Sequence, residues 1–183
     1  MKGSWELLNT RPLCETPYLQ VAEETVATPT RPHGVKWFVS YRPEAAVIAP
    51  QLPDGRLVMI RQERVAVRET LWEFPAGQLD HGNILTTASR ELDEEAGLMA
   101  EKFIPLGSFF TSPGFTTERC HLFLATGCRP LKDRSPQDDG EAILETRAFE
   151  PRHIHAMVAS GEIHDANSLA IYARLIALGH LKP

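Results

Sequence analysis

The sequence predicts an α+β fold with a mixed or antiparallel sheet. Up to about residue 75 the chain consists of short segments rich in β-branched and aromatic residues, separated by proline and glycine, which is typical of strands. Helical spacing then appears at residues 84–97, strand-like segments return, and the chain closes with two helical segments. This order lacks the regular strand–helix alternation of a parallel βαβ sheet.

The predicted strands of the first half are PYLQVAEETVAT, GVKWFVSYRP, AAVIAP, RLVMIRQ and LWEFP. The Pro53-Asp54-Gly55 turn between the third and fourth of them predicts a hairpin, because proline presets the first turn dihedral and glycine accepts a positive one. We therefore expect antiparallel pairing across this turn.

The helix expected at residues 84–97 has a recurring apolar face and Gly97 as its stop. That face comprises Leu85, Ala88, Leu92, Ala96 and Met99. Further strands are predicted in KFIPLGSFF, RCHLFLAT and AILETRAF, and helices in PRHIHAMVASG and NSLAIYARLIALGH, the last one capped by Asp165.

Composition limits the classes of function. The 183 residues are 43% hydrophobic, enough for one buried core, and the net charge of −5 comes without a basic stripe, which makes nucleic acid an unlikely partner. The three cysteines form no C-x-x-C pair, as expected of reduced thiols. Since no run approaches the ~18 apolar residues of a membrane span, we expect no membrane association and a cytoplasmic protein.

Negative charge is concentrated in the segment SRELDEEAG, residues 89–97. On a helix Glu91, Glu94 and Glu95 stand at i, i+3 and i+4, on one side, where like charges repel. A solvated acidic face is one interpretation of this pattern. The other is a site for a hard divalent cation, Mg²⁺ or Mn²⁺, whose preferred ligands are carboxylate oxygens.

The longer segment EFPAGQLDHGNILTTASRELDEEAGL resembles the signature of the Nudix hydrolases. The matching residues are Gly77, Arg90, Glu91, Leu92, Glu94, Glu95, Gly97 and Leu98. Asn83 stands where the family has its first glutamate, and the stretch from there to Arg90 is one residue shorter than usual. The resemblance implies an α/β/α sandwich with a mixed central sheet, preceded here by a small N-terminal antiparallel β segment.

Site residues follow from the same resemblance. Glu91, Glu94 and Glu95 would bind the metal together with the backbone carbonyl of Ala76, and Glu94 is also expected to take part in catalysis. Glu141, in the polar stretch QDDGEAIL, resembles the loop glutamate that acts as base, with Asp138 and Asp139 as competitors. Without the Nudix context this stretch is an ordinary acidic turn.

Three further segments resemble the ADP-ribose pyrophosphatase branch: EFPAG, SPGFTTER and HDANSLAIYARL. By this resemblance Trp37 and Arg42 sandwich the adenine, Arg64 meets the diphosphate, and Glu118 contacts the distal ribose or a metal. The alternatives are a core tryptophan and an exposed arginine at a strand end. Trp37 and Phe38 alternate along their strand, so only one can face a given side.

The implied function is Mg²⁺-dependent hydrolysis of ADP-ribose or a related nucleotide sugar to AMP and a sugar phosphate. GDP-mannose, NADH or a flavin nucleotide are alternative substrates, and the Asn83 departure keeps open a catalytically impaired nucleotide-binding module. We expect residues 1–43 to form an N-terminal β segment that serves dimerisation, possibly by exchange between subunits, and residues 44–183 to form the hydrolase domain. A homodimer is therefore predicted.

Overall fold

The computed structural model describes residues 4–79, 82–132, 135 and 142–182. The chain forms two compact units. Residues 1–43 and 110–119 make up the N-terminal unit, and residues 44–109 and 120–183 make up the main unit. Each is described by itself.

The N-terminal unit is an antiparallel sheet of three strands in the order β1-β2-β3. Its strands are β1 (Glu6–Glu15), β2 (Gln20–Thr28) and β3 (Arg31–Tyr41). The predicted N-terminal antiparallel segment is thus confirmed. β1 is exposed along its whole length, whereas β2, in the middle, buries Ala22, Val26 and Ala27. Residues 110–119 join this unit through the parallel bridge between Ser40 and Thr116.

The main unit has a mixed four-stranded sheet in the order β7-β4-β10-β9. The bounds of these strands are β4 (Ala45–Pro50), β7 (Ala76–Gln78), β9 (Lys102–Phe110) and β10 (Arg119–Thr126). β4 runs parallel to β10 and antiparallel to β7. The second sheet, in the order β12-β5-β6, is antiparallel and comprises β5 (Leu57–Arg64), β6 (Glu69–Glu73) and β12 (Ile143–Phe149). The short strands β8 (Leu98–Met99) and β11 (Arg129–Pro130) pair separately.

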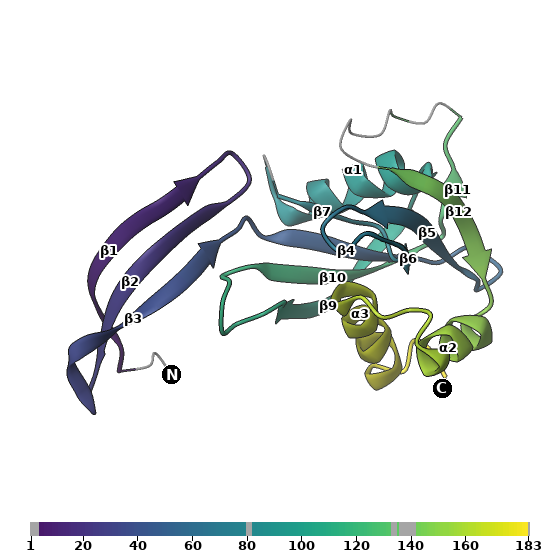
Figure 1. The fold of residues 1–183 in the computed structure, drawn as a ribbon. Coiled ribbons are helices and arrows are strands. Elements are labelled where there is room, and N and C mark those ends of the chain that lie inside the picture. The colour runs from purple at the N-terminus through teal and green to yellow at the C-terminus, as the bar shows by residue number, and fades with distance from the viewer. Residues whose placement is uncertain (1–3, 80–81, 133–134, 136–141, 183) are drawn as a thin grey trace. The chain divides into compact units, whose positions relative to one another are not determined.

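Helices cover both faces of the main unit, as Figure 1 shows. α1 (Ile84–Ala96) lies on one face, and α2 (Pro151–Ser160) and α3 (Ala166–Ala177) lie on the other. β4 is fully buried because its alternating side chains supply both cores. Ala46 and Ile48 join the core that contains Leu92 of α1, whereas Val47 and Ala49 join the core that contains Ile171 of α3. The predicted α+β sandwich with a mixed sheet is confirmed.

Local signals set the helix ends. α1 stops at Gly97, which adopts the left-handed conformation with φ 64° and donates its N–H to the carbonyls of Asp93 and Leu92, as predicted. Asp165 caps α3 by accepting the Ser168 N–H at 2.8 Å, also as predicted. In the described part of the chain, no helix is both long and apolar enough to cross a bilayer.

Two expectations about these elements are confirmed only in part. The Pro53-Asp54-Gly55 turn forms and is followed by one antiparallel bridge, between Gln51 and Leu57, but the pairing extends no further, because β4 and β5 take their partners in different sheets. The buried side of α1 also differs from the predicted apolar face, since Leu85 and Met99 are exposed. In addition to apolar residues it contains two glutamates: the buried residues are Thr87, Ala88, Glu91, Leu92, Glu95 and Ala96.

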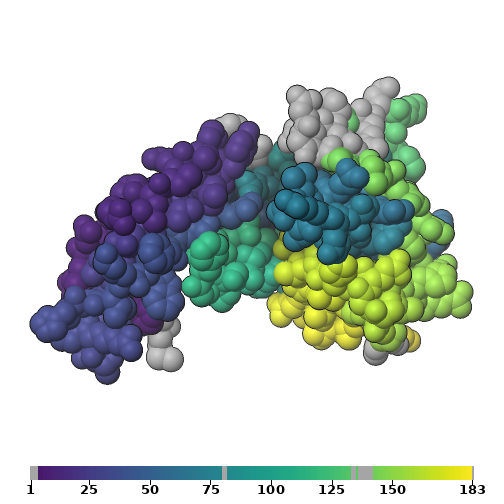
Figure 2. Space-filling view, in the orientation of Figure 1, coloured from purple at the N-terminus to yellow at the C-terminus, as the bar shows by residue number. Residues whose placement is uncertain are grey.

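The hairpin of β5 and β6 packs beside α3 in the main unit. Figure 2 shows the hairpin, in blue, directly next to the yellow surface of α3. The Ser168 hydroxyl of α3 accepts the Phe74 N–H at 3.0 Å, and His164, just before α3, contacts Glu69 of β6 at 3.2 Å. The end of β6 is therefore fixed against the start of α3.

Candidate functional site

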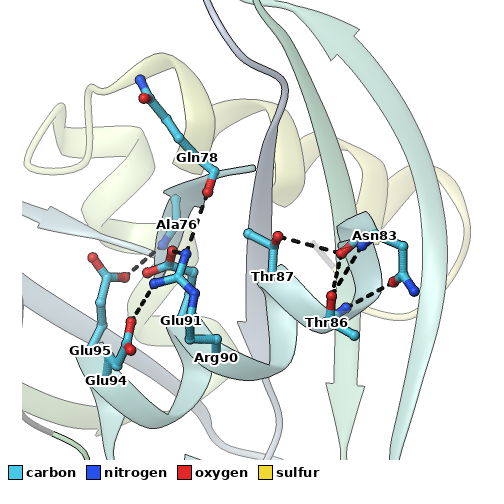
Figure 3. A network of polar contacts seen from close by, with 9 residues as sticks. All are labelled: Ala76, Gln78, Asn83, Thr86, Thr87, Arg90, Glu91, Glu94 and Glu95. Atoms are coloured by element: carbon cyan, nitrogen blue, oxygen red, sulfur yellow. Dashed lines mark hydrogen bonds and ion pairs between the residues drawn. The ribbon is translucent and has the colours of Figure 1, made fainter. Parts of the chain in front are cut away.

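The glutamates of α1 lie on the side of the helix that faces β7 (Figure 3). Glu91 and Glu95 are 3% and 1% exposed, and the Glu94 side chain is 19% exposed. A solvated acidic face is therefore excluded for Glu91 and Glu95. Carboxylates removed from water in this way require hydrogen bonds or counter-charges.

Arg90 supplies one such charge. Its guanidinium donates to Glu91 Oε1 at 2.6 Å through Nη2 and to Glu94 Oε2 at 2.5 Å through Nη1, and Nη2 also reaches the Gln78 carbonyl at 3.4 Å. Figure 3 shows the guanidinium between the two carboxylates. Arg90 thus links neighbouring acidic side chains that would otherwise repel each other.

β7 contacts the same side of α1 through its backbone. The Ala76 N–H donates to Glu95 Oε2 at 2.7 Å. Gly77 leaves room for the Glu91 carboxylate, since a Cβ atom built on Gly77 would stand 1.9 Å from Glu91 Oε1. The two residues that follow Pro75 are therefore fitted closely to the helix, and the predicted ligands Ala76 and Glu95 are hydrogen-bonded neighbours.

The donor set suits a hard cation, because it offers three carboxylates on one side of α1. In the arrangement seen here the carboxylates bind Arg90 and the Ala76 N–H. Over the described residues, no group of three acidic, histidine or cysteine side chains is disposed around one metal position.

Arg64, at the end of β5, is held by a buried carboxylate. Its Nε donates to Glu73 Oε1 at 2.8 Å and its Nη2 to Glu73 Oε2 at 2.5 Å. The hydrogen bonds that Arg64 donates to Glu73 raise the pKa of Arg64. Burial opposes this rise, and attraction from Glu73, Glu95 and Asp165 adds to it. Arg64 therefore lies in the same electrostatic environment as Glu95 of α1.

The predicted substrate-binding residues Trp37, Arg42 and Glu118 all lie in the N-terminal unit, where Arg42 contacts Glu118 and Trp37 contacts Gly114. The Trp37 indole N–H donates to the Gly114 carbonyl at 3.2 Å. Arg42 Nε lies 3.0 Å from Glu118 Oε1, and the other Glu118 oxygen accepts from the Thr111 hydroxyl at 2.9 Å. Trp37 is 43% exposed, so it is not a core tryptophan.

Asn83, the departure from the Nudix signature, caps α1. Its Oδ1 accepts from the backbone N–H groups of Leu85 at 2.9 Å and Thr86 at 3.0 Å, and the Thr86 hydroxyl pairs with the Asn83 backbone (Figure 3). This is a reciprocal capping box. Asn83 thus has a structural role at the start of the helix that carries the glutamates.

Sequence reasoning missed two side chains near the site, Glu73 and Ser168. Both lie in segments that carried the resemblance, EFPAG and HDANS, but neither had been given a role. The signal available was a polar residue inside an otherwise apolar context, which in a fold requires a partner. Glu141, Asp138 and Asp139 lie outside the described residues.

Comparison with known proteins identifies the family of the chain. The NUDIX domain family matches residues 40–170. A Bacillus subtilis protein named ADP-ribose pyrophosphatase is 34% identical over 127 residues, which span 69% of this chain and 68% of the relative. A Mycobacterium tuberculosis protein of the same name is 36% identical over 129 residues, spanning 69% of this chain and 61% of the relative.

A solved structure described as an ADP compounds hydrolase superposes with a TM-score of 0.79. It covers 97% of both chains at 20% sequence identity, and this likeness concerns the fold. The family match over more than half of the chain confirms the resemblance predicted from the sequence. The chain belongs to the Nudix family.

Proposed function

We propose that this protein hydrolyses the diphosphate bond of ADP-ribose, or of a related nucleotide sugar, to AMP and a sugar phosphate. Two curated relatives that are 34% and 36% identical to the chain are named for this activity. The observation that carries the proposal is the burial of Glu91 and Glu95 on the side of α1 that meets Ala76 and Gly77. Buried carboxylates that lie close together are costly and concentrate at functional sites.

Glu91, Glu94, Glu95 and the Ala76 carbonyl would hold Mg²⁺ or Mn²⁺. When bound, such an ion stabilises the charge that develops on phosphate oxygens and lowers the pKa of a bound water. Glu94, the most accessible of the three glutamates, is proposed to act in catalysis as well. Arg90 would keep its position beside these carboxylates and counter their mutual repulsion in the metal-free protein.

The decisive measurement is AMP release from ADP-ribose. We expect turnover with Mg²⁺ or Mn²⁺, none in EDTA, and a loss of about a hundredfold or more in Glu95→Gln. Glu101→Gln is the matched control, because Glu101 is an exposed glutamate paired with Arg129 on the surface. A wild-type protein that leaves ADP-ribose, ADP-glucose and GDP-mannose intact with either metal would overturn the proposal.

Glu141 is proposed as the base that takes a proton from the attacking water. Its support is the resemblance of the QDDGEAIL stretch to the corresponding loop of the family. Glu141→Gln should lower kcat with little change in KM, whereas Asp138→Asn and Asp139→Asn should not. The opposite ranking would move the role to one of the aspartates.

Trp37 and Arg42 are proposed to bind the adenine, Arg64 the diphosphate, and Glu118 the distal ribose. Glu118 holds Arg42 in the N-terminal unit, which gives it a second role in fixing that side chain. Trp37→Ala should raise KM by about tenfold or more, since stacking on an aromatic ring is worth about 1–3 kcal/mol. Phe38→Ala is the control, because the neighbouring side chain points to the other face of β3.

The nucleotide preference is tested by a panel. We expect kcat/KM to be highest for ADP-ribose among ADP-ribose, ADP-glucose, GDP-mannose, NADH and a flavin nucleotide. Calorimetric binding of ADP-ribose without turnover under any metal would identify instead a nucleotide-binding module that has lost catalysis.

We further propose that the protein is a cytoplasmic homodimer, assembled through the N-terminal segment 1–43. The outermost strand β1 is exposed throughout, and β1 and the residue before it carry large apolar side chains, which a monomer would leave in water. These are Trp5, Leu7, Leu8 and Leu13. The mass in solution should be that of a dimer for the wild type and of a monomer for Leu7→Glu/Leu13→Glu, and a monomeric wild type would refute the proposal.

A further inference from the structure

Glu73 stands out among the polar groups that the proposed chemistry does not use. Its side chain is 4% exposed, yet it is the carboxylate that receives both hydrogen bonds from one edge of the Arg64 guanidinium. A carboxylate buried to this degree is stable only when paired, so it holds Arg64 firmly. The bidentate geometry fixes the plane of the guanidinium as well as its position.

The backbone around Glu73 is itself restrained. Glu73 pairs with Ile60 in the register of β5 and β6, and the next residue, Phe74, donates its N–H to the buried Ser168 hydroxyl of α3. Arg64 is held at the other end of the same register, opposite Glu69. Backbone pairing therefore holds both Glu73 and Arg64 in position.

The remaining edge of the guanidinium is available for a ligand. Arg64 retains 39% exposure of its side chain, and within the described part of the chain Nη1 makes no hydrogen bond. With one edge fixed by Glu73, the other edge presents two parallel donors in a set orientation. Such an edge matches two oxygens of a phosphate group.

We propose that Glu73 is a positioning residue that orients Arg64 so that its outer edge receives oxygens of the substrate diphosphate. This inference rests on the proposed function, since it assigns Glu73 a role in binding the substrate of that reaction. Glu73 does not touch the substrate and acts only through Arg64.

The test compares Glu73→Gln with the wild type. The introduced amide retains one acceptor oxygen but directs N–H groups toward Arg64 Nη2, so the Arg64 guanidinium should rotate out of its present orientation. The KM for ADP-ribose should therefore rise about tenfold, with kcat within about threefold of the wild type. Glu145→Gln is the matched control. Glu145 lies 3.8 Å from Arg61, which is on β5 like Arg64, but this pair is exposed, so the substitution should leave KM unchanged. An unchanged KM in Glu73→Gln, at unchanged kcat, overturns the inference.

A double-mutant cycle separates positioning from a general effect on stability. Glu73→Gln added to Arg64→Ala should raise KM no further, whereas full additivity of the two effects overturns the positioning role. Arg64→Lys keeps the charge beside Glu73 but lacks the fork, so it should raise KM about as much as Glu73→Gln, and it remains informative if Glu73→Gln fails to fold. A wild-type KM in Arg64→Lys contradicts the inference.

These results are distinguishable from failure of the proposed function. If the wild type turns over no nucleotide, the function is wrong and the positioning role falls with it. If the wild type is active and the Glu73 and Arg64 variants match it, the hydrolase function stands, whereas the positioning role of Glu73 and the assignment of Arg64 to the diphosphate are wrong. Calorimetric titration with ADP, which carries the diphosphate without the second ribose, gives an independent readout, in which Kd should rise about tenfold in Glu73→Gln.

Discussion

The carboxylate of Glu91 occupies the space beside Gly77 where any other residue would place its Cβ atom. A Cβ built there would lie 1.9 Å from Glu91 Oε1 and 2.0 Å from its carboxyl carbon. Gly77 is not among the glycines with positive φ, so its backbone conformation is open to alanine. The requirement for glycine at this position is therefore steric and comes from Glu91.

Gly77→Ala should displace the Glu91 carboxylate from its place beside β7. Because the displaced group is a proposed metal ligand, we expect kcat/KM to fall about a hundredfold or more, with a loss of about 1–3 kcal/mol in stability from overpacking. AMP release and denaturant unfolding measure the two effects. Gly114→Ala is the control for stability, since Gly114 also lacks a positive φ and has open space around its Cβ position. Wild-type activity in Gly77→Ala would show that Glu91 can move without consequence.

Asn83→Ala should weaken the start of α1. The Asn83 side chain accepts two backbone N–H groups there, and loss of such a cap costs about 1 kcal/mol, or about 2–4 °C in melting temperature for a chain of this length. Asn83→Asp keeps the acceptor oxygen and adds a charge that suits a helix N-terminus, so it should melt at or above the wild-type temperature.

The activity of the same variants answers whether the departure from the signature impairs the enzyme. Since Asn83 acts in the cap, turnover of Asn83→Asp measured well below the melting temperature should stay within about threefold of the wild type. A large loss in Asn83→Asp, with the cap retained, would assign Asn83 a part in the chemistry.

Local signals in the sequence were sufficient for most helix and strand boundaries. Gly97 and Asp165 act on the residues next to them, so their roles as stop and cap could be predicted from their positions alone. The Pro53-Asp54-Gly55 turn gives a single antiparallel bridge and no longer hairpin, because β4 pairs with β7 and β10, which are distant in sequence. The membership of residues 110–119 in the N-terminal unit is long-range in the same way.

The candidate site was predictable as a set of residues but not as an arrangement. Helical periodicity assigns charged residues to the outer face, yet Glu91 and Glu95 are buried. Arg90 and the backbone of β7 supply their hydrogen-bond partners, and the spacing of residues in the sequence does not reveal such contacts. Glu73 was overlooked for a related reason. Its pairing with Arg64 depends on the register of β5 and β6, which the sequence did not reveal.

His164→Gln should make stability less dependent on pH. His164 Nδ1 lies 3.0 Å from the Gly161 carbonyl and Nε2 lies 3.2 Å from Glu69, so two acceptors face the ring and favour the imidazolium. The hydrogen bond with Glu69 is the main cause that raises the pKa of His164. The resulting stabilisation is complete below the ordinary histidine value of about 6.5 and is lost as the pH rises through the raised folded pKa.

The melting temperature of the wild type should therefore exceed that of His164→Gln at pH 5.5, by no more than about 3 °C for so exposed a pair, and the gap should close by pH 9. Glu69→Gln removes the other partner and should show the same pattern. A difference in melting temperature that grows with rising pH would contradict the proposed stabilisation by protonated His164.

Ser168→Ala should destabilise the protein by leaving the Phe74 N–H without its acceptor. Ser168 is fully buried, and its hydroxyl lies 3.0 Å from the Phe74 nitrogen. A buried donor that loses its partner costs about 1–3 kcal/mol, which corresponds to a fall of about 2–12 °C in melting temperature. Ser160→Ala is the matched control, because the exposed Ser160 hydroxyl donates to the Met157 carbonyl, and its loss should change stability by less than about 0.5 kcal/mol. Equal melting temperatures for the two variants would mean that Phe74 finds another acceptor and that α3 does not fix the end of β6.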